Sequence, residues 1–393
     1  YEGDEAMGLL SAWTAMWHPG LLGTSEGAPN WYRSSSPPTD ASNLRILVPT
    51  VGQDDLPAGF VDRAKGEGAR LICGDFERDE LLAQALEPIA NRITQLDESI
   101  AADFLALGYA YLQVELLTRQ MRYATNLDEI HFQNQAMAGA KAALEGNNDE
   151  AKDKLHSCFD LLAQERDHDY AVDAYVLDLT LVAANTMGDG LARELNSDIP
   201  VNLLATADQL ARMQQEAPDS FDALKKGLAA DTVGLVGGEC RELRTTLYGC
   251  ESVLRQLQSG LDRFKQLVGK RPTIYGRRRF GMSTLYPQLL DRLGYAGVLH
   301  ATLDAGKFPE GSQAKLRWEG LDNTAIDALA RVPLDASKPE AFLSLASKLG
   351  ETMDMDHIAT VYFAHWPGRV CPWYHDLRRV ARYGTMLGKF VTI

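Results

Sequence analysis

The stretch "RPTIYGRRRFGMSTLYPQLLDRLGYAGVLHATL" (Arg271–Leu303) contains a strand, a helix and a second strand in succession. Its two ends, "RPTIYG" and "YAGVLHATL", are short apolar runs next to Pro and Gly, which is typical of buried strands. The segment "STLYPQLLDRLG" lies between them and has a helical pattern of apolar residues. A strand, a helix and a strand in this order predict two parallel strands joined by a helical crossover.

The same alternation continues on both sides of this stretch. Further strands are predicted at "YVLDLTLVA", "IPVNLLATA", "DTVGLVGGE" and "HIATVYFAHW", with helices at "ADQLARMQQEA" and "SVLRQLQSGLDRFKQLVG". So many units predict an α/β fold in which the strands close into a (β/α)7-type barrel. We assign residues 167–393 to the main barrel portion and expect its chemistry at the carboxyl ends of the strands.

The first 166 residues have a different pattern. "LRILVPT" and "ARLICGD" are short apolar runs with a helical segment between them, so residues 1–77 are predicted to be a βαβ-like N-terminal segment of the barrel. From residue 78 to 166 the chain is predicted to be a long helical insertion or side domain. Its clearest apolar face is formed by Phe104, Leu107, Tyr111, Val114 and Met121.

Composition excludes several classes of protein. The chain has 393 residues, 45% hydrophobic and 24% charged, as in an ordinary soluble globular protein. A formal net charge of −15 repels phosphate and argues against nonspecific binding to nucleic acid or anionic membranes. Since no apolar run approaches the ~18 residues needed to span a bilayer, we expect no membrane span.

The five cysteines are odd in number and scattered, without a CxxC pair. This is typical of reduced thiols, so we expect a reducing compartment and a cytoplasmic location. No signal peptide is visible. Because the chain opens without Met and ends on "GKFVTI", which is typical of the middle of a strand, we expect it to be a piece of a longer protein, cut at the C-terminus of the barrel.

Candidate site residues are those at predicted strand ends: Asp208, Glu239, Glu242, Arg277–Arg279, Asp304, His365 and Trp366. In "VGLVGGECRE", two glycines permit a tight backbone turn before Glu239 and Glu242. Two carboxyl groups there could serve as acid and base. Ordinary surface glutamates in a solvated loop are the alternative.

The segment "YFAHWPGRVCPWYHDL" is the densest in aromatic residues. Core packing accounts for Tyr362 and Phe363, whereas Trp366 precedes Pro-Gly and suits the wall of a sugar site. His365 has no second metal ligand at a clear spacing. The residues Asp354, Asp356 and His357 in "MDMDHIA" precede a strand, so a solvated turn at the opposite end of the barrel is the better interpretation.

The three arginines in "GRRRFG" do not form a P-loop, because the GxxxxGK[ST] spacing is missing. Guanidinium groups could bind a sulfate, a phosphate or a carboxylate there. The alternative is a surface run paired with some of the 54 acidic residues.

Together, four segments resemble the catalytic domain of glycoside hydrolase family 38, the α-mannosidases, over about residues 197–393. They are "LKKGLAADTVGLVGGECRELRTTLYGCESVLRQL", "YGRRRFGMSTLYPQLLDRLGYAGVL", "LRWEGLDNTAIDALARVPLD" and "VYFAHWPGRVCPWYHDLRRVARYG", in the order of the family. The resemblance implies a seven-stranded barrel, a retaining glycosidase and a bound metal, usually zinc. Glu242, Trp318 and Asp322 keep family-like places.

The departures from the family concern its chemistry. The family's nucleophile, which also ligates the metal, is the Asp two residues before Phe-Gly, and here that residue is Arg278. Two further family aspartates are replaced by Arg244 and His365, and a tryptophan by Cys240. The family's His-x-Asp metal pair is not visible. Arginine can neither attack a sugar nor bind zinc, so we expect no metal or other cofactor unless zinc ligands lie outside this segment.

Two functions are therefore predicted from the sequence. In the favoured one, a glycoside-hydrolase-like protein, Glu239 and Glu242 are the catalytic pair and Arg278 binds an acidic or sulfated sugar. Substrate binding is then shared by Arg278, Trp318, Asp322, His365 and Trp366. In the alternative, a catalytically inactive barrel binds glycans or serves in assembly. An Arg278 side chain that closes the pocket by pairing with either glutamate argues against the enzyme.

Nucleic-acid binding through the arginines conflicts with the net charge. The sequence does not specify the sugar or the oligomeric state.

Overall fold

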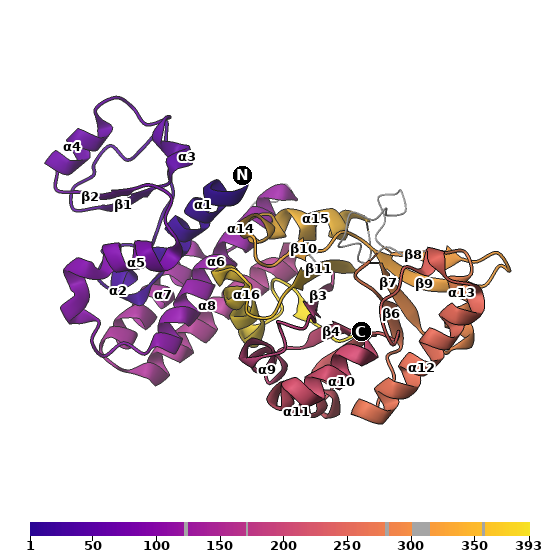
Figure 1. The fold of residues 1–393 in the computed structure, drawn as a ribbon. Helices are drawn as coiled ribbons and strands as arrows, with labels where there is room; N and C mark the ends of the chain where they lie inside the picture. Colours follow the sequence, from indigo (N-terminus) through magenta and orange to yellow (C-terminus); the bar gives the residue numbers. More distant parts are fainter. Residues whose placement is uncertain (122–124, 170–171, 280–282, 301–314, 356–357) are drawn as a thin grey trace. The chain divides into compact units, whose positions relative to one another are not determined.

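The computed structural model describes residues 1–121, 125–169, 172–279, 283–300, 315–355 and 358–393 (Figure 1). The chain forms two compact units. The first comprises residues 1–172, 338–350 and 371–387, and the second comprises residues 173–337, 351–370 and 388–393. These units interleave in sequence, so they differ from the three consecutive segments that the sequence predicts.

The first unit is mainly helical. Its described elements are α1 (Gly3–Ala15), α2 (Pro19–Leu22), β1 (Arg45–Val48), α3 (Thr50–Gln53), α4 (Phe60–Gly66), β2 (Arg70–Cys73), α5 (Arg78–Leu86), the 3-10 helix η1 (Glu87–Arg92), α6 (Glu98–Gln120), α7 (Glu129–Leu144), α8 (Asn148–Asp169), α14 (Pro339–Leu343) and α16 (Pro372–Tyr383). The predicted helical character of residues 78–166 is confirmed by α5 to α8.

Helix α6 is the centre of this unit. It is long and apolar enough, by length and composition, to cross a membrane, but 67% of its 18-residue apolar window is buried inside the protein. Phe104 and Leu107 are fully buried, as the apolar face predicts. A core helix passes the same test of length and composition, so we interpret α6 as the core of this unit.

The two N-terminal strands form their own small sheet. β1 and β2 are parallel, and Arg45 lies opposite Arg70. Helices α3 and α4 lie between the two strands in the sequence, so the βαβ arrangement is as predicted. Neither strand pairs with the large sheet of the second unit. The expectation that residues 1–77 are a segment of the barrel is therefore wrong: these short strands bury their apolar residues against α4, around Phe60 and Ala64.

The second unit carries the large sheet. Its elements are β3 (Ala174–Leu181), α9 (Asp189–Leu195), β4 (Val201–Ala205), α10 (Ala207–Glu216), α11 (Pro218–Ala229), β5 (Val233–Gly237), η2 (Thr245–Leu247), α12 (Cys250–Val268), β6 (Ile274–Gly276), α13 (Tyr286–Arg292), β7 (Gly297–His300), β8 (Lys315–Glu319), β9 (Ala325–Ala330), β10 (Leu334–Asp335), β11 (Ala359–His365) and β12 (Lys389–Phe390). Helix α15 (Leu345–Met355) begins in the first unit and ends in the second. All six strands predicted from the sequence are present.

The described strands follow the order β10-β11-β3-β4-β5-β6-β7-β9-β8, and β12 also pairs with β3. All neighbours are parallel except β8, which is antiparallel to β9. Figure 1 shows this sheet curled, with α10, α11 and α12 on its outer side. The predicted α/β barrel-type fold is therefore confirmed.

Alternation along the strands separates the two faces of the sheet. Leu177, Leu179 and Leu181 of β3 join Tyr362 and Ala364 of β11 in a cluster built from strand residues and the last residues of the chain, which is the inner face. The residues between them face outward, where β4 and β5 pack on α9 to α12. Successive side chains of a strand point to opposite faces, so this register fixes which polar groups can reach the inside.

Candidate functional site

The turn after β5 depends on its two glycines. Gly237 and Gly238 have φ angles of 137° and 126°, a backbone region that side chains disfavour. A Cβ atom would lie 2.3 Å from the carbonyl oxygen of Ala205 at Gly237, and 1.7 Å from the hydroxyl of Tyr295 at Gly238. The sequence Gly-Gly thus allows the chain to turn sharply and bring Glu239 over the strand ends.

Glu239 is buried at the end of β5, with 6% of its surface exposed. Its Oε1 atom accepts hydrogen bonds from the hydroxyl of Tyr275 (2.8 Å) and from Nη1 of Arg277 (3.2 Å). Burial raises the pKa of Glu239, although Arg277 and Tyr275 oppose that shift. Glu239 is therefore a paired and desolvated carboxyl group, which excludes the alternative of a solvated surface glutamate.

Glu242 lies in the same loop and is held by the arginine run. Its Oε1 atom accepts hydrogen bonds from the backbone N–H groups of Arg278 and of Arg279, the latter at 2.9 Å. Its Oε2 atom lies 3.3 Å from Nε of Arg278. Only 7% of the Glu242 side chain is exposed, so both carboxylate oxygens are engaged.

Arg278 spans the carboxyl ends of the strands. It follows β6, binds Glu242 after β5, and donates from Nη1 to the carbonyl oxygen of Val182 just after β3 (3.2 Å). Its guanidinium carbon lies 5.9 Å from the ring centre of Trp366, at the end of β11. Arg278 therefore bridges groups from four strands and closes the mouth of the curled sheet.

Little space remains beneath this bridge. The hollow lined by Glu239, Glu242, Arg277 and Arg278 has a volume of about 250 Å³ when open solvent is included, and its free part accommodates about one water molecule. Ligand pockets usually measure roughly 300–1,000 Å³. In this conformation the strand ends are filled by the protein's own side chains, and no sugar ring fits among them.

His365 lies away from this group. Tyr362 and Ala364 face inward, so His365, one residue further on, points to the outer face. Its Nε2 atom lies 3.0 Å from Oδ1 of Asp178, and its Nδ1 atom lies 3.9 Å from Oε2 of Glu194. The side chains of His365 and Asp178 are fully buried. The sheet therefore separates the imidazole from the inner face, and substrate binding by His365 stays a prediction.

Burial lowers the pKa of His365, but the charge and hydrogen bond of Asp178, helped by Glu194, outweigh burial and raise it. The structure thus assigns this histidine to a buried ionic cluster.

Trp318 and Asp322 are not brought to the strand ends either. Trp318, on β8, packs in the outer layer, where its ring stacks on Tyr286 at 6.2 Å and meets His300 edge-on at 4.7 Å. Asp322 lies in the exposed turn between β8 and β9 and accepts a hydrogen bond from the hydroxyl of Thr324 (2.7 Å). Because β8 is antiparallel to β9, this turn precedes β9 and lies where the parallel strands begin. Substrate binding by Trp318 and Asp322 stays a prediction.

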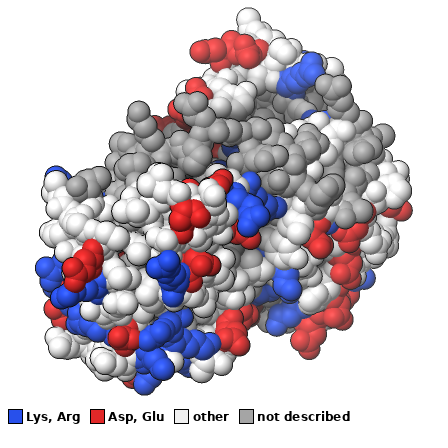
Figure 2. Space-filling view, turned by 90° about the vertical axis from the view of Figure 1, so that its right-hand side faces the viewer, with Lys and Arg blue, Asp and Glu red and all other residues white. Residues whose placement is uncertain are grey.

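Of the other candidates, Asp208 lies in the first turn of α10, where it forms ion pairs with Arg241 and Arg263 and its backbone N–H donates to the carbonyl oxygen of Cys240. Asp304, Asp356 and His357 lie outside the described residues. Figure 2 shows basic and acidic side chains interspersed over the face that it displays, without a continuous basic surface on that face.

A zinc site of the family type does not fit the donor groups present. The position of the metal-binding aspartate is Arg278, whose guanidinium is a permanent cation and offers no lone pair to a metal. Within the described parts of the chain, no group of three His, Cys, Asp or Glu side chains could hold a metal ion. The absence of a cofactor and the cytoplasmic location both stay predictions. The five cysteines are free thiols that form no disulfide in this structure.

Two residues of this site, Tyr275 and Tyr295, are not among the candidates from the sequence, and a third, Arg277, is named there only within the run Arg277–Arg279. Tyr275 and Tyr295 surround the Gly237–Glu239 turn, and Arg277 holds Glu239 and also donates to the carbonyl oxygen of Leu243. Tyr275 and Tyr295 are typical core residues of strands and strand entries, so only their hydroxyl contacts reveal them. Arg277 could be identified only as one of three adjacent arginines.

Comparisons with known proteins agree with the resemblance found in the sequence. Residues 199–360 match the family described as "Glycosyl hydrolases family 38 N-terminal domain". That range contains β4 to β9 and most of the site above. No curated protein matches the chain.

Several solved structures show low similarity to part of this chain. An α-mannosidase from Enterococcus faecalis V583 is 16% identical with a TM-score of 0.45, covering 56% of this chain and 28% of that protein. A family 38 protein from Enterococcus faecalis is 15% identical with a TM-score of 0.41, covering 56% and 26%. A 4-α-glucanotransferase from Thermococcus litoralis is 12% identical with a TM-score of 0.40, covering 56% and 37%.

The matched part is thus 26–37% of the length of these proteins. The family match over residues 199–360 confirms that the barrel portion of this chain is similar to the N-terminal domain of family 38 glycosyl hydrolases.

Proposed function

We propose that this protein binds carbohydrate through a family 38-like barrel that no longer hydrolyses glycosides. The observation that carries the loss of hydrolysis is the bridge formed by Arg278, which binds Glu242 and the carbonyl of Val182 across the strand ends. The carbohydrate class is supported by the family match over residues 199–360. Binding without hydrolysis was the alternative in the sequence interpretation, and the pairing of Arg278 with Glu242 now favours it.

The chemistry of glycoside hydrolysis explains why this pairing matters. One carboxyl group must protonate the leaving oxygen, while a second attacks the anomeric carbon or activates a water molecule. Here Glu242 accepts hydrogen bonds on both oxygens, and Glu239 is held by Tyr275 and Arg277. Neither carboxylate faces a space that admits a sugar ring, and the nucleophile position is a cation.

The same contacts argue against a preference for acidic or sulfated sugars at this point. The guanidinium of Arg278 already donates to Glu242 and Val182 and stacks near Trp366. A sulfate would have to compete with a carboxylate that is already in place. We therefore propose that neutral glycans are bound at least as well as sulfated or uronic ones.

Two assays test this proposal on the full chain. The first measures release of nitrophenol from a panel of aryl glycosides, including α-mannosides, and release of sugars from sulfated and uronic oligosaccharides. The second measures binding of the same neutral and charged glycans by calorimetry. We expect no hydrolysis above buffer, but saturable binding of at least one neutral glycan.

Hydrolysis by the wild type that disappears in both Glu239→Gln and Glu242→Gln would overturn the loss of activity. The absence of binding to every glycan would overturn the carbohydrate class. A preparation of Arg212→Ala, altered in an exposed ion pair of α10, is the matched control for handling and folding.

A further inference from the structure

Three arginines of the first unit gather at one end of the small β1–β2 sheet. Arg45 and Arg70 are the first residues of the two strands and lie opposite each other. Arg92 is the last residue of the 3-10 helix η1. We call these three residues the arginine cluster, and we propose that it binds the phosphate or sulfate group of a small ligand. This inference concerns the first unit and stands apart from the proposed carbohydrate function.

The two strand arginines point to the same side of their sheet. The next residue of each strand, Ile46 or Leu71, packs on the side of α4. Successive side chains of a strand point to opposite faces, so Arg45 and Arg70 point to the other side. Figure 1 shows α4 above β1 and β2, and α2 and α5 below them.

Helix η1 brings Arg92 to that same side. Ile89 of η1 packs with Leu21 of α2, and the carbonyl oxygen of Leu21 accepts a hydrogen bond from Nη1 of Arg45 (3.2 Å). Burial lowers the pKa of Arg45, and the charges of Arg70 and Arg92 lower it further. The three guanidinium groups therefore share one region of the surface, and they repel one another.

Arg45 and Arg70 are held by the protein through one terminal nitrogen each. Besides Leu21, Nη1 of Arg45 donates to the hydroxyl oxygen of Thr24 (3.0 Å). Nη2 of Arg70 donates to a backbone carbonyl oxygen of α5 (3.0 Å) and to Oε2 of Glu87 (3.3 Å). The described residues supply no partner for the other nitrogens of these two side chains. Their guanidinium groups are thus oriented but only partly used.

The unused nitrogens are open to solvent. None of them is among the buried polar atoms that lack a partner in the described parts of the chain. The Arg70 side chain is 40% exposed, and Arg92 is an exposed residue whose side chain has no contact with any described residue. A ligand can therefore reach all three guanidinium groups from solution.

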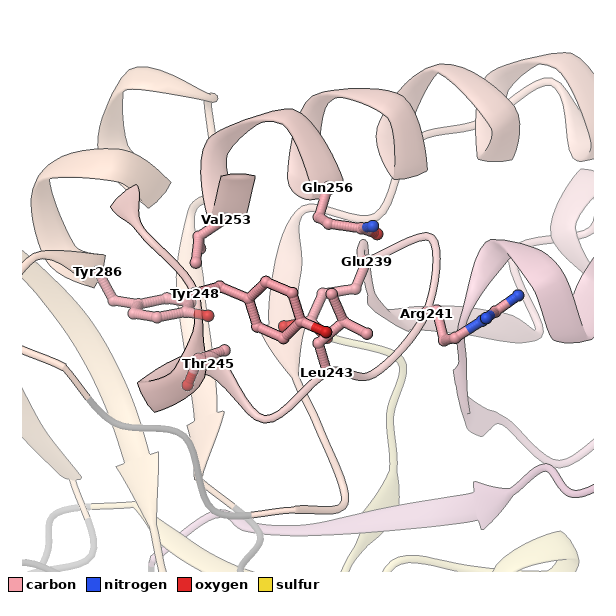
Figure 3. Close-up of a pocket in the computed structure, with 8 residues that line it drawn as sticks. All are labelled: Glu239, Arg241, Leu243, Thr245, Tyr248, Val253, Gln256 and Tyr286. Atoms are coloured by element: carbon pink, nitrogen blue, oxygen red, sulfur yellow. The ribbon is translucent and has the colours of Figure 1, made fainter. Parts of the chain in front are cut away.

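A hollow beside helix α12 of the second unit differs from the arginine cluster (Figure 3). Its free part accommodates about one water molecule. Its arginine, Arg241, points away from the hollow and pairs with Asp208 at 3.1 Å. That guanidinium is therefore compensated and faces elsewhere, whereas those of the arginine cluster are gathered and accessible.

Little negative charge compensates the arginine cluster. Its one ion pair within the described residues is Arg70–Glu87, and the Glu87 side chain is 81% exposed. Two guanidinium charges stay unpaired, on a chain whose formal net charge is −15. A bound dianion would neutralise this local excess and remove the repulsion within the cluster.

Helix capping explains the cluster only in part. Arg45 and Arg70 bind carbonyl oxygens of α2 and of the last turn of α5, where a cation is stabilising. Capping does not account for Arg92, which binds no carbonyl oxygen of the described residues.

The geometry of the guanidinium group indicates the class of ligand. Arginine binds phosphate and sulfate oxygens two at a time, and a tetrahedral dianion offers several oxygens in a small volume. Three converging guanidinium groups suit such a group better than a single carboxylate. A long polyanion is disfavoured, because the acidic remainder of the surface repels it.

Calorimetry and thermal unfolding of the full chain test this inference. The probes are sodium phosphate, sodium sulfate and glucose 6-phosphate, with glucose and sodium chloride as controls, all at one ionic strength. The test variants are Arg92→Gln, Arg45→Gln and Arg45→Lys. The matched control is Arg33→Gln, which removes an exposed arginine next to Ser34, and Ser34 lies against α3 beyond the other end of β1.

We expect the three oxyanions to bind the wild type and to raise its unfolding temperature, unlike glucose or chloride. Arg92→Gln should weaken binding about fivefold and Arg45→Gln about tenfold, as charge-assisted hydrogen bonds are lost. Arg45→Lys keeps the charge without the fork and should lie between Arg45→Gln and the wild type. Arg33→Gln should stay within about twofold of the wild type.

The stability of Arg92→Gln separates binding from folding. In chloride this variant should unfold at the wild-type temperature or above it, because a repelling charge is removed and no contact is lost. Tighter binding of glucose 6-phosphate than of inorganic phosphate supports a phosphate ester as the ligand, and equal affinities support the free oxyanion.

Three outcomes overturn the inference. The first is that no oxyanion binds the wild type at constant ionic strength. The second is that Arg92→Gln and Arg45→Gln bind as tightly as the wild type, which places the anion elsewhere. The third is that Arg33→Gln weakens binding as much as Arg92→Gln does, which reduces the effect to overall charge.

Discussion

The second unit contains two buried ionic clusters that differ in the nature of their cation. At the ends of β5 and β6, Glu239 and Glu242 are paired with Arg277 and Arg278. On the outer face of β3 and β11, Asp178 and Glu194 face His365. Arginine stays charged at every relevant pH, whereas histidine titrates near neutrality. The first cluster is therefore a permanent closure, and the second is sensitive to pH.

The clusters also differ in how their acids are held. Glu242 accepts two backbone N–H groups as well as a guanidinium, so it keeps partners when one side chain is lost. The side chain of Asp178, in contrast, is fully buried and lies beside the imidazole of His365. Four substitutions test this contrast, and they are given in order of decreasing expected loss of stability.

The largest effect is expected from Asp178→Ala, which leaves a buried imidazole without its carboxylate. Breaking a buried pair by removing one partner typically costs about 3–5 kcal/mol. Urea unfolding at pH 6 should show this loss. Asp178→Asn, which keeps the size and a hydrogen-bonding group, is the control and should lose less. A loss below about 1 kcal/mol in Asp178→Ala would contradict the pairing seen in the structure.

A slightly smaller effect is expected from Arg277→Met. Glu239 loses one of its two partners but keeps the hydroxyl of Tyr275, and it can take up a proton. We expect a loss of about 2–4 kcal/mol at neutral pH. The loss should shrink as the pH falls and Glu239 becomes neutral. An equal loss at pH 4.5 and pH 7.5 would show that the Arg277 charge is not what stabilises Glu239.

The third prediction concerns pH and His365. Its pKa is raised in the folded protein, so its stabilising contribution is fully present below the unfolded value of about 6.5 and is lost as the pH rises through the folded value. Unfolding free energies of the wild type and His365→Gln, measured from pH 5.5 to 8.5, should therefore converge as the pH rises. Parallel curves would exclude a protonated His365.

The smallest effect on stability is expected from Arg278→Met. Its side chain is 30% exposed, and Glu242 keeps its backbone donors, so about 1 kcal/mol or less should be lost. Arg212→Ala, an exposed i,i+4 pair, should lose about 0.3–0.5 kcal/mol and serves as the reference. If Arg278→Met lowers the free energy of unfolding as much as Arg277→Met does, the contacts of Arg278 across the strand ends stabilise the fold as much as the Arg277–Glu239 pair.

The fold was largely readable from local patterns. Alternation of apolar strands with amphipathic helices identified all six strands named in the barrel portion, because burial against helices demands continuous apolar runs. The sheet to which β1 and β2 belong could not be predicted, because the sequence pattern of a short βαβ unit is the same whether or not its strands join a larger sheet. The β8–β9 hairpin reversed the direction expected for Asp322, and strand direction is a property of pairing.

The site was readable only in part. Glu239, Glu242 and Arg278 do meet at the strand ends, where Gly-Gly and the replacement of the family's aspartate had drawn attention to them. The side of the sheet on which His365 lies could not be predicted, because one residue along a strand changes the face and the exact register of β11 decides which residues face inward.

The sequence by itself determined the class of fold, the similarity to family 38 and the presence of an arginine at residue 278, where the resemblance places the family's nucleophile, because these depend on residue identity and order. The tertiary structure alone decided that Arg278 bridges the strand ends and that His365 lies on the outer face of the sheet. Those facts depend on distances between residues far apart in the chain, and such distances are fixed only when the strands pair and the sheet curls.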